Sequence, residues 1–81
     1  MKEQDLINLG FKKVDADADG VPFYYYEYEF GDTCLISSAN DESENDKWSV
    51  ESDNYLQIKF KKLNDLKIYI SLLQSIFRYY V

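Results

Sequence analysis

The chain has no histidine and only one cysteine, Cys34. Without a second cysteine, no disulfide can close within the chain and no cluster of thiolates can bind zinc. The lack of histidine removes the commonest general base, the usual partner of a reactive thiol and most transition-metal sites. No glycine-rich phosphate-binding loop is present either. The sequence therefore predicts a protein that is not an enzyme, in which Cys34 has a buried structural role.

Long apolar runs are also missing. No stretch approaches the roughly 18 consecutive apolar residues that a membrane helix needs, and the N-terminal MKEQDLINLG lacks the apolar core of a signal peptide. Together with the single cysteine, this predicts a soluble protein of the reducing cytoplasm that makes no membrane contact. The content of 46% hydrophobic and 17% aromatic residues predicts one packed domain over residues 1–81.

Positive charge is absent from the middle of the chain. Between Val14 and Asp46 there are ten acidic residues and no Lys or Arg, whereas six basic and three acidic residues follow from Lys47 onward. The net charge of −6 argues against binding to duplex nucleic acid, because neutralised phosphates supply most of that affinity. We expect instead that the acidic half of the chain recognises a basic protein surface.

The pattern of apolar residues predicts an α+β domain. A short helix is expected over residues 3–9, ended by a left-handed cap at Gly10. An antiparallel meander of four or five strands is expected to follow, over residues 11–15, 23–30, 33–37, 47–52 and 55–60, with a solvated acidic loop before Trp48. Apolar residues then recur with helical period from about Asn64 to the C-terminus. This long helix is expected to cover one face of the sheet.

The run FYYYEYEF is the strongest strand signal. Alternation places its even-numbered aromatic residues, from Tyr24 to Phe30, on the buried face of the strand, and places Tyr25, Glu27 and Glu29 on the solvated face. Gly31 and Asp32 then form a hairpin turn. A two-residue turn pairs Tyr28 with Leu35 and a three-residue turn pairs it with Ile36; both registers remain open.

The stretch DADADG resembles the first half of a calcium loop. Asp15, Asp17, Asp19 and the Val21 carbonyl would be the ligands of a calcium-stabilised module. The position of the final bidentate glutamate holds Tyr26 instead, and the flanking segments read as strands. The alternative is a solvated hairpin loop that joins FKKV to FYYYEYEF.

The C-terminal helix has a wide apolar arc. Beside its main stripe, a second line consists of Ile68, Leu72 and Tyr79. Either the helix lies deep between the sheet and the first helix, or this line forms a homodimer contact.

The combination of PFYYYEYEFGD, CLIS and an acidic loop before Trp48 resembles short uncharacterised proteins of bacteria and their phages. The likeness runs from DLINLGF to the last helix and implies a small stand-alone domain. The function that we expect is that of a phage-type inhibitor or immunity-style protein, which engages a basic surface that otherwise binds nucleic acid. The expected contacts are the aromatic anchor Tyr25 and the acidic residues Glu27, Glu29, Asp32, Asp41, Glu42, Glu44 and Asp46.

Overall fold

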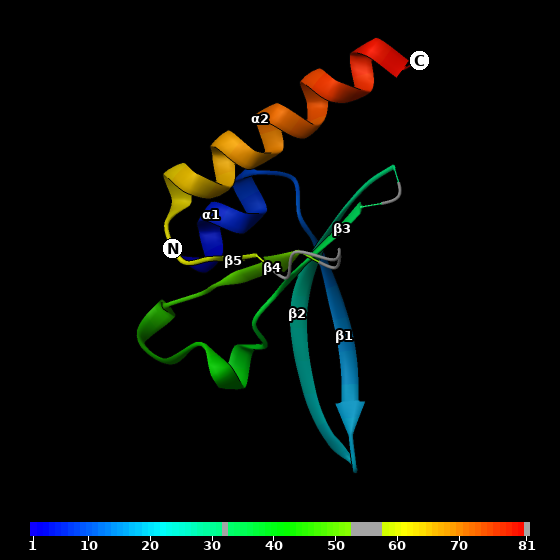
Figure 1. The fold of residues 1–81 in the computed structure, drawn as a ribbon. Helices are drawn as coiled ribbons and strands as arrows, with labels where there is room; N and C mark the ends of the chain where they lie inside the picture. Colours follow the sequence, from blue (N-terminus) through cyan, green and yellow to red (C-terminus); the bar gives the residue numbers. More distant parts are fainter. Residues whose placement is uncertain (32, 53–57, 81) are drawn as a thin grey trace.

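The computed structural model describes residues 1–31, 33–52 and 58–80, except for the side chains of residues 76–80. The elements, in chain order, are α1 (Glu3–Asn8), β1 (Lys12–Ala18), β2 (Val21–Phe30), β3 (Thr33–Ser37), the 3₁₀ turns η1 (Asn40–Glu42) and η2 (Glu44–Asp46), β4 (Val50–Ser52), β5 (Lys59–Phe60) and α2 (Leu63–Tyr80). The five strands form one antiparallel meander in the order β1-β2-β3-β4-β5. Both helices lie on the same side of the sheet (Figure 1), so the predicted α+β architecture is confirmed.

Helix α1 is short and is held at both ends. The Asp5 carboxylate accepts a hydrogen bond of 2.8 Å from the Lys2 N–H, which satisfies a free donor at the start of the helix. Gly10 follows the helix with a φ of +96°, the left-handed conformation predicted for the cap. Leu6 is fully buried, and Phe11 joins the same core directly after the turn. Two helical turns are therefore stabilised by their packing on the sheet.

Strand β1 is longer than predicted, because it continues through Ala18 instead of ending at Asp15. The acidic stretch is thus mostly strand, and only Asp19 and Gly20 form the turn. Their φ angles of +53° and +83° fit the type I′ turn that Asp-Gly favours between antiparallel strands. The Asp17 carboxylate accepts a 2.8 Å hydrogen bond from the Gly20 N–H. The loop prediction was wrong because pairing with the long aromatic strand outweighs the weak strand propensity of aspartate.

The β2–β3 hairpin has the two-residue register, in which Tyr28 faces Leu35 and Glu27 faces Ile36. Beyond Ser37 the chain turns away from β2. Side-chain oxygens then accept the hydrogen bonds of β2 N–H groups that a neighbouring strand would otherwise accept. The Tyr26 N–H donates to Ser37 Oγ at 2.8 Å, and the Tyr24 N–H donates to Asn40 Oδ1 at the same distance. The outer half of the β1–β2 hairpin therefore extends away from the helices, as Figure 1 shows.

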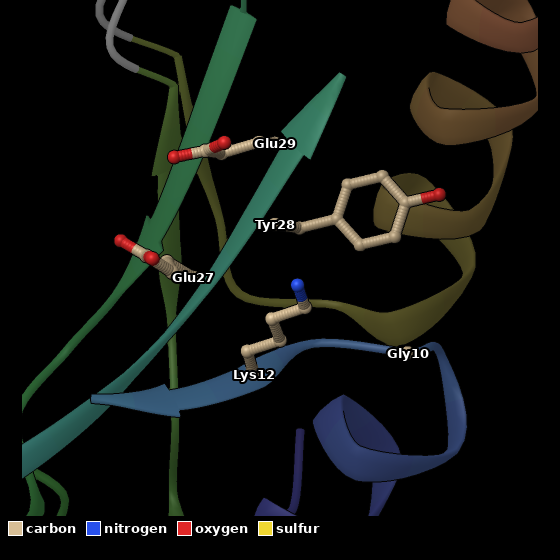
Figure 2. Close-up of a pocket in the computed structure, with 5 residues that line it drawn as sticks. All are labelled: Gly10, Lys12, Glu27, Tyr28 and Glu29. Carbon is tan, nitrogen blue, oxygen red and sulfur yellow. The ribbon is translucent and has the colours of Figure 1, made fainter.

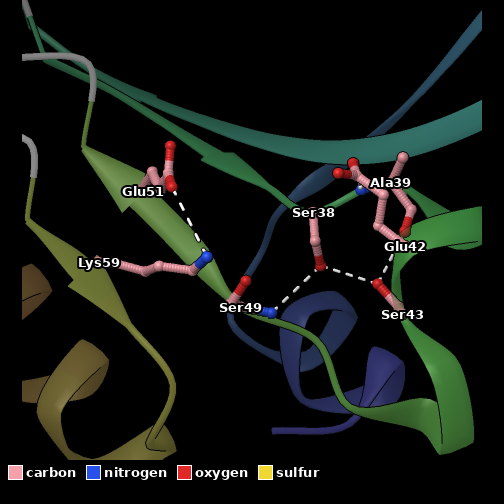
Figure 3. Close-up of polar contacts among 7 residues, drawn as sticks. All are labelled: Ser38, Ala39, Glu42, Ser43, Ser49, Glu51 and Lys59. Carbon is pink, nitrogen blue, oxygen red and sulfur yellow. Dashed lines mark hydrogen bonds and ion pairs between the residues drawn. The ribbon is translucent and has the colours of Figure 1, made fainter.

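Residues 38–49 are more ordered than the solvated loop that the sequence predicted. Ser43 is buried and its hydroxyl donates to the Ala39 carbonyl at 2.7 Å. Because that hydroxyl has one proton, the 2.7 Å contact with Ser38 is donated by Ser38, whose oxygen accepts from the Ser49 N–H at 3.2 Å. Figure 3 shows this chain of hydrogen bonds, which fixes the 3₁₀ turns beside β4.

The core lies between the even-numbered face of β2 and the two helices. Tyr26, Leu35, Val50 and Phe60 project from four strands toward the helices, where Leu66 is the fully buried contribution of α2. Lys13 places its ammonium 4.2 Å from the centre of the Tyr24 ring at the edge of this layer. Among the described residues, no helix is long and apolar enough to cross a membrane.

A hydrogen bond between side chains joins α1 to the sheet. The Tyr26 hydroxyl donates to Glu3 Oε2 at 2.6 Å, while the Tyr26 ring is only 4% exposed. Burial raises the pKa of Tyr26 above its ordinary value of 10.0, and the hydrogen bond to Glu3 raises it further. The pKa of Tyr24 is also raised, by desolvation and by the same carboxylate. These phenols therefore remain protonated in the folded protein at neutral pH.

Candidate functional site

The sheet face opposite the helices, here called the open face, is covered by no described helix. The strand registers define its members. Odd-numbered positions of β2 project from it, together with the residues that they pair with on β1 and β3. It is formed by Lys12, Val14, Ala16, Phe23, Tyr25, Glu27, Glu29, Cys34 and Ile36, and by Glu51 and Lys59 on the last two strands.

One end of the open face is apolar. Phe23 and Tyr25 stack with their ring centroids 6.4 Å apart, and both rings are partly exposed. Val14 and Ala16 lie opposite them on β1, and Ile36, on β3, is 39% exposed. Exposed aromatic side chains of this kind are frequent anchors of protein interfaces. The predicted anchor Tyr25 therefore has Phe23 and Val14 as apolar neighbours on one side, and Glu27, which lies opposite Ile36, on the other.

The other end of the open face is acidic. Glu27 and Glu29 project to one side of β2 and Tyr28 to the other, as Figure 2 shows. Together with Gly10 and Lys12 they line a pocket of about 340 Å³. Glu27 is half-buried, whereas Glu29 is exposed. A cationic side chain of a partner would find two carboxylates here, beside the aromatic patch.

Few of the acidic side chains that the structure describes lie in ion pairs. Among the residues that the structure describes, the one ion pair joins Lys59 to Glu51, at 3.8 Å and with both side chains exposed. Glu42 lines a second pocket, of about 150 Å³, together with Ile36, Glu51 and Lys59. Figure 3 shows Ser38 and Ser49 between Glu42 and the Glu51–Lys59 pair. Glu42 therefore lies at the border of the open face.

The other predicted acidic contacts do not join this site as one patch. Asp41 and Glu44 are exposed on the 3₁₀ turns. Asp46 Oδ1 accepts hydrogen bonds from the Glu3 N–H at 2.9 Å and from the Trp48 indole N–H at 3.0 Å, so this carboxylate holds α1 and Trp48 in place. Asp32 lies outside the described residues. The predicted acidic surface is thus divided between the open face and the 3₁₀ turns.

The predicted calcium ligands lie along an extended hairpin. Asp15 and Asp17 are exposed on the face of β1 opposite the open face, Asp19 occupies the turn, and Val21 is 62% exposed at the start of β2. In the described part of the chain, no three His, Cys, Asp or Glu side chains are grouped so that they could hold a metal ion. Calcium binding by this hairpin stays a prediction.

The second apolar line of α2 is exposed in the monomer. Ile68 is 60% and Leu72 57% exposed, while the side chain of Tyr79 lies outside the described residues. The prediction that the helix lies deep between sheet and α1 does not hold for these two positions. Self-association through them stays a prediction.

Sequence reasoning missed Phe23, Ile36 and Lys12 as members of the site. Phe23 lies two residues before Tyr25 in β2, so strand alternation alone could have placed it on the same face. Ile36 and Lys12 depend on the registers of two hairpins, and only the registers place both beside Glu27.

Comparison of the chain with protein-family models, with curated proteins and with solved structures found no match.

Proposed function

We propose that this protein is a small acidic binding protein without enzymatic activity, which engages a basic surface of another protein through its open face. The observation that supports this most is the position of Tyr25 beside Glu27 and Glu29 on a sheet face that no described helix covers. Lys12 lies opposite Glu27, yet neither Glu27 nor Glu29 forms an ion pair within the described residues. An apolar anchor beside such carboxylates complements a partner with cationic side chains around an apolar contact.

The charge distribution supports the same proposal. The net charge of −6 would attract a positive surface over about 10 Å at ordinary salt, and the acidic 3₁₀ turns would add to this field without direct contact. A basic groove that otherwise holds nucleic acid is a surface of this kind. Occupying it would make the protein a phage-type inhibitor or an immunity-style protein.

The test is affinity capture from a bacterial lysate, with the full chain as bait, followed by titration of the captured protein. We expect Glu27→Gln with Glu29→Gln to weaken binding about tenfold, and Tyr25→Ala to weaken it by a similar factor. The matched control is Asp41→Asn with Glu44→Gln, which removes the same two charges from outside the open face. This control should weaken binding only a few-fold, through the association rate.

Salt provides the second measurement. Raising NaCl from about 50 to 300 mM should weaken binding of the wild type more than that of the Glu27/Glu29 variant, because the variant has fewer charges to screen. Binding that is independent of salt would contradict the proposal, as would equal effects of the two pairs of substitutions.

A further inference from the structure

Strand β1 is the first in the sheet order, and none of the described residues pairs with its outer edge. Ala18 and Val21 close a two-residue turn and therefore form a hydrogen-bonded pair, and such pairs recur at every second residue of the strand. The main-chain N–H and C=O groups of Lys13, Asp15 and Asp17 thus point away from β2 and into solvent.

Hydrogen bonds on the side of β2 that faces away from β1 confirm which backbone groups point outward. Tyr24 and Tyr26 lie opposite Asp15 and Lys13, and their N–H groups donate to Asn40 and Ser37 on the side away from β1. At the other end of the sheet, β5 is only two residues long, and the Met1 ammonium donates to the carbonyls of Trp48 and Lys61 beside it. The long available edge is therefore β1.

The side chains along this edge carry both signs of charge. Lys13 and Asp15 are exposed on the same face of β1, two residues apart. Charges on an edge strand ordinarily prevent pairing with other strands. In this strand their order makes β1 complementary to itself when a second copy runs antiparallel, because a lysine then lies opposite an aspartate.

We propose that β1 pairs antiparallel with β1 of a second copy, about a two-fold axis at Val14. In this register Lys13 of each copy lies opposite Asp15 of the other copy. Each of these two equivalent pairs exchanges main-chain hydrogen bonds. The two Val14 side chains meet on the axis. A register centred on Asp15 would place two carboxylates opposite each other, and one centred on Ala16 would oppose Asp15 to Asp17. The register at Val14 is the one of the three without a like-charge pair.

The pairing has a consequence for the open face. A two-fold axis perpendicular to the sheet keeps the same face of both copies on the same side. Tyr25 and Val14 of one copy would then lie in one row with Val14 and Tyr25 of the second copy. Ala16 and Phe23 of each copy would extend this apolar strip toward the hairpin turn of that copy, where Lys12 and Glu27 of the other copy border it. This inference does not depend on the proposed function, since it is tested on the isolated protein.

The experiment is sedimentation equilibrium of the full chain over a wide range of concentrations. We expect a monomer–dimer equilibrium for the wild type. Asp15→Lys and Lys13→Asp should each raise the dissociation constant at least about tenfold, because each opposes like charges. The double variant Lys13→Asp/Asp15→Lys restores opposite charges at both pairs and should return within about threefold of the wild type. Circular dichroism verifies that each variant is folded.

A cysteine scan tests the register. In a Cys34→Ser background, Val14→Cys should form an intermolecular disulfide, because a pair without main-chain hydrogen bonds brings its Cα atoms to about 4.5 Å. The matched control Ala16→Cys lies opposite Lys12 of the second copy and should not crosslink. A wild type that stays monomeric at millimolar concentration would overturn the proposal. So would a double variant no better than the single ones, or a dimer that Ile68→Lys/Leu72→Lys abolishes and Asp15→Lys leaves intact.

Discussion

At the scale of single residues, the hydrogen bond between Tyr26 and Glu3 connects the two parts of the core. The Tyr26 O–H donates to the Glu3 carboxylate at 2.6 Å, and a hydrogen bond to a charged acceptor contributes more to stability than one between neutral groups. We predict that Tyr26→Phe lowers the free energy of unfolding by about 1–3 kcal/mol at pH 8, measured by urea denaturation.

The same bond predicts a dependence on pH. Because the folded state raises the pKa of Tyr26 above 10.0, the unfolded chain releases the phenolic proton first as pH rises. The contribution of Tyr26 to the free energy of unfolding is therefore fully present below about pH 10 and declines above it. The phenylalanine variant has no phenolic proton, so it lacks this dependence on pH. The difference between the two proteins should shrink between pH 8 and pH 11. A constant difference between the two proteins would contradict the assignment.

At the scale of elements, Ser37 supports β2 where β3 departs. Its hydroxyl accepts from the buried Tyr26 N–H at 2.8 Å and donates to the Ser38 carbonyl at 2.8 Å. Ser37→Ala would leave that N–H without a partner, and we predict a loss of about 1–3 kcal/mol in unfolding free energy. The control is Ser49→Ala, whose side chain makes no hydrogen bond within the described residues and which should change stability by less than about 0.5 kcal/mol. Equal losses in the two variants would contradict this role.

Local patterns predicted the elements better than their connections. Helix α1, the cap at Gly10 and the buried parity of β2 all follow from short-range rules, and the structure confirms them. The weak strand propensity of aspartate hides the end of β1, which continues to Ala18, although Asp19-Gly20 marks a tight hairpin turn in the sequence itself. The site was predicted in part, since parity grouped Tyr25 with Glu27 and Glu29. The positions of Asp46 and Glu42 depend on the path of residues 38–49 from β3 to β4. This segment has no helical or strand periodicity from which its path could be predicted.

At the scale of the whole molecule, negative charge exceeds what the fold neutralises. Fifteen acidic residues stand against nine basic ones, and one exposed ion pair is found among the described residues. Their mutual repulsion should be weaker in the unfolded chain, where the charges lie farther apart, so screening should favour the folded state. We predict that the melting temperature rises by a few degrees between about 10 and 300 mM NaCl. Calorimetry with an equal osmolality of glycerol as the control checks this, and a fall with NaCl would contradict it.

The departure of β3 from β2 at Ser37 also divides the molecule into parts of unequal stability. Beyond that point no third strand from the described part of the chain pairs with the β1–β2 ribbon, and two strands by themselves are only marginally stable in water. Unfolding can therefore begin at the Asp19-Gly20 tip and proceed inward as a local event, stopping where Asn40 and Ser37 bind the backbone of β2. We therefore expect the outer ribbon to open as a separate cooperative unit, and a contact that covers β1 to suppress this local opening before it affects the global stability of the domain.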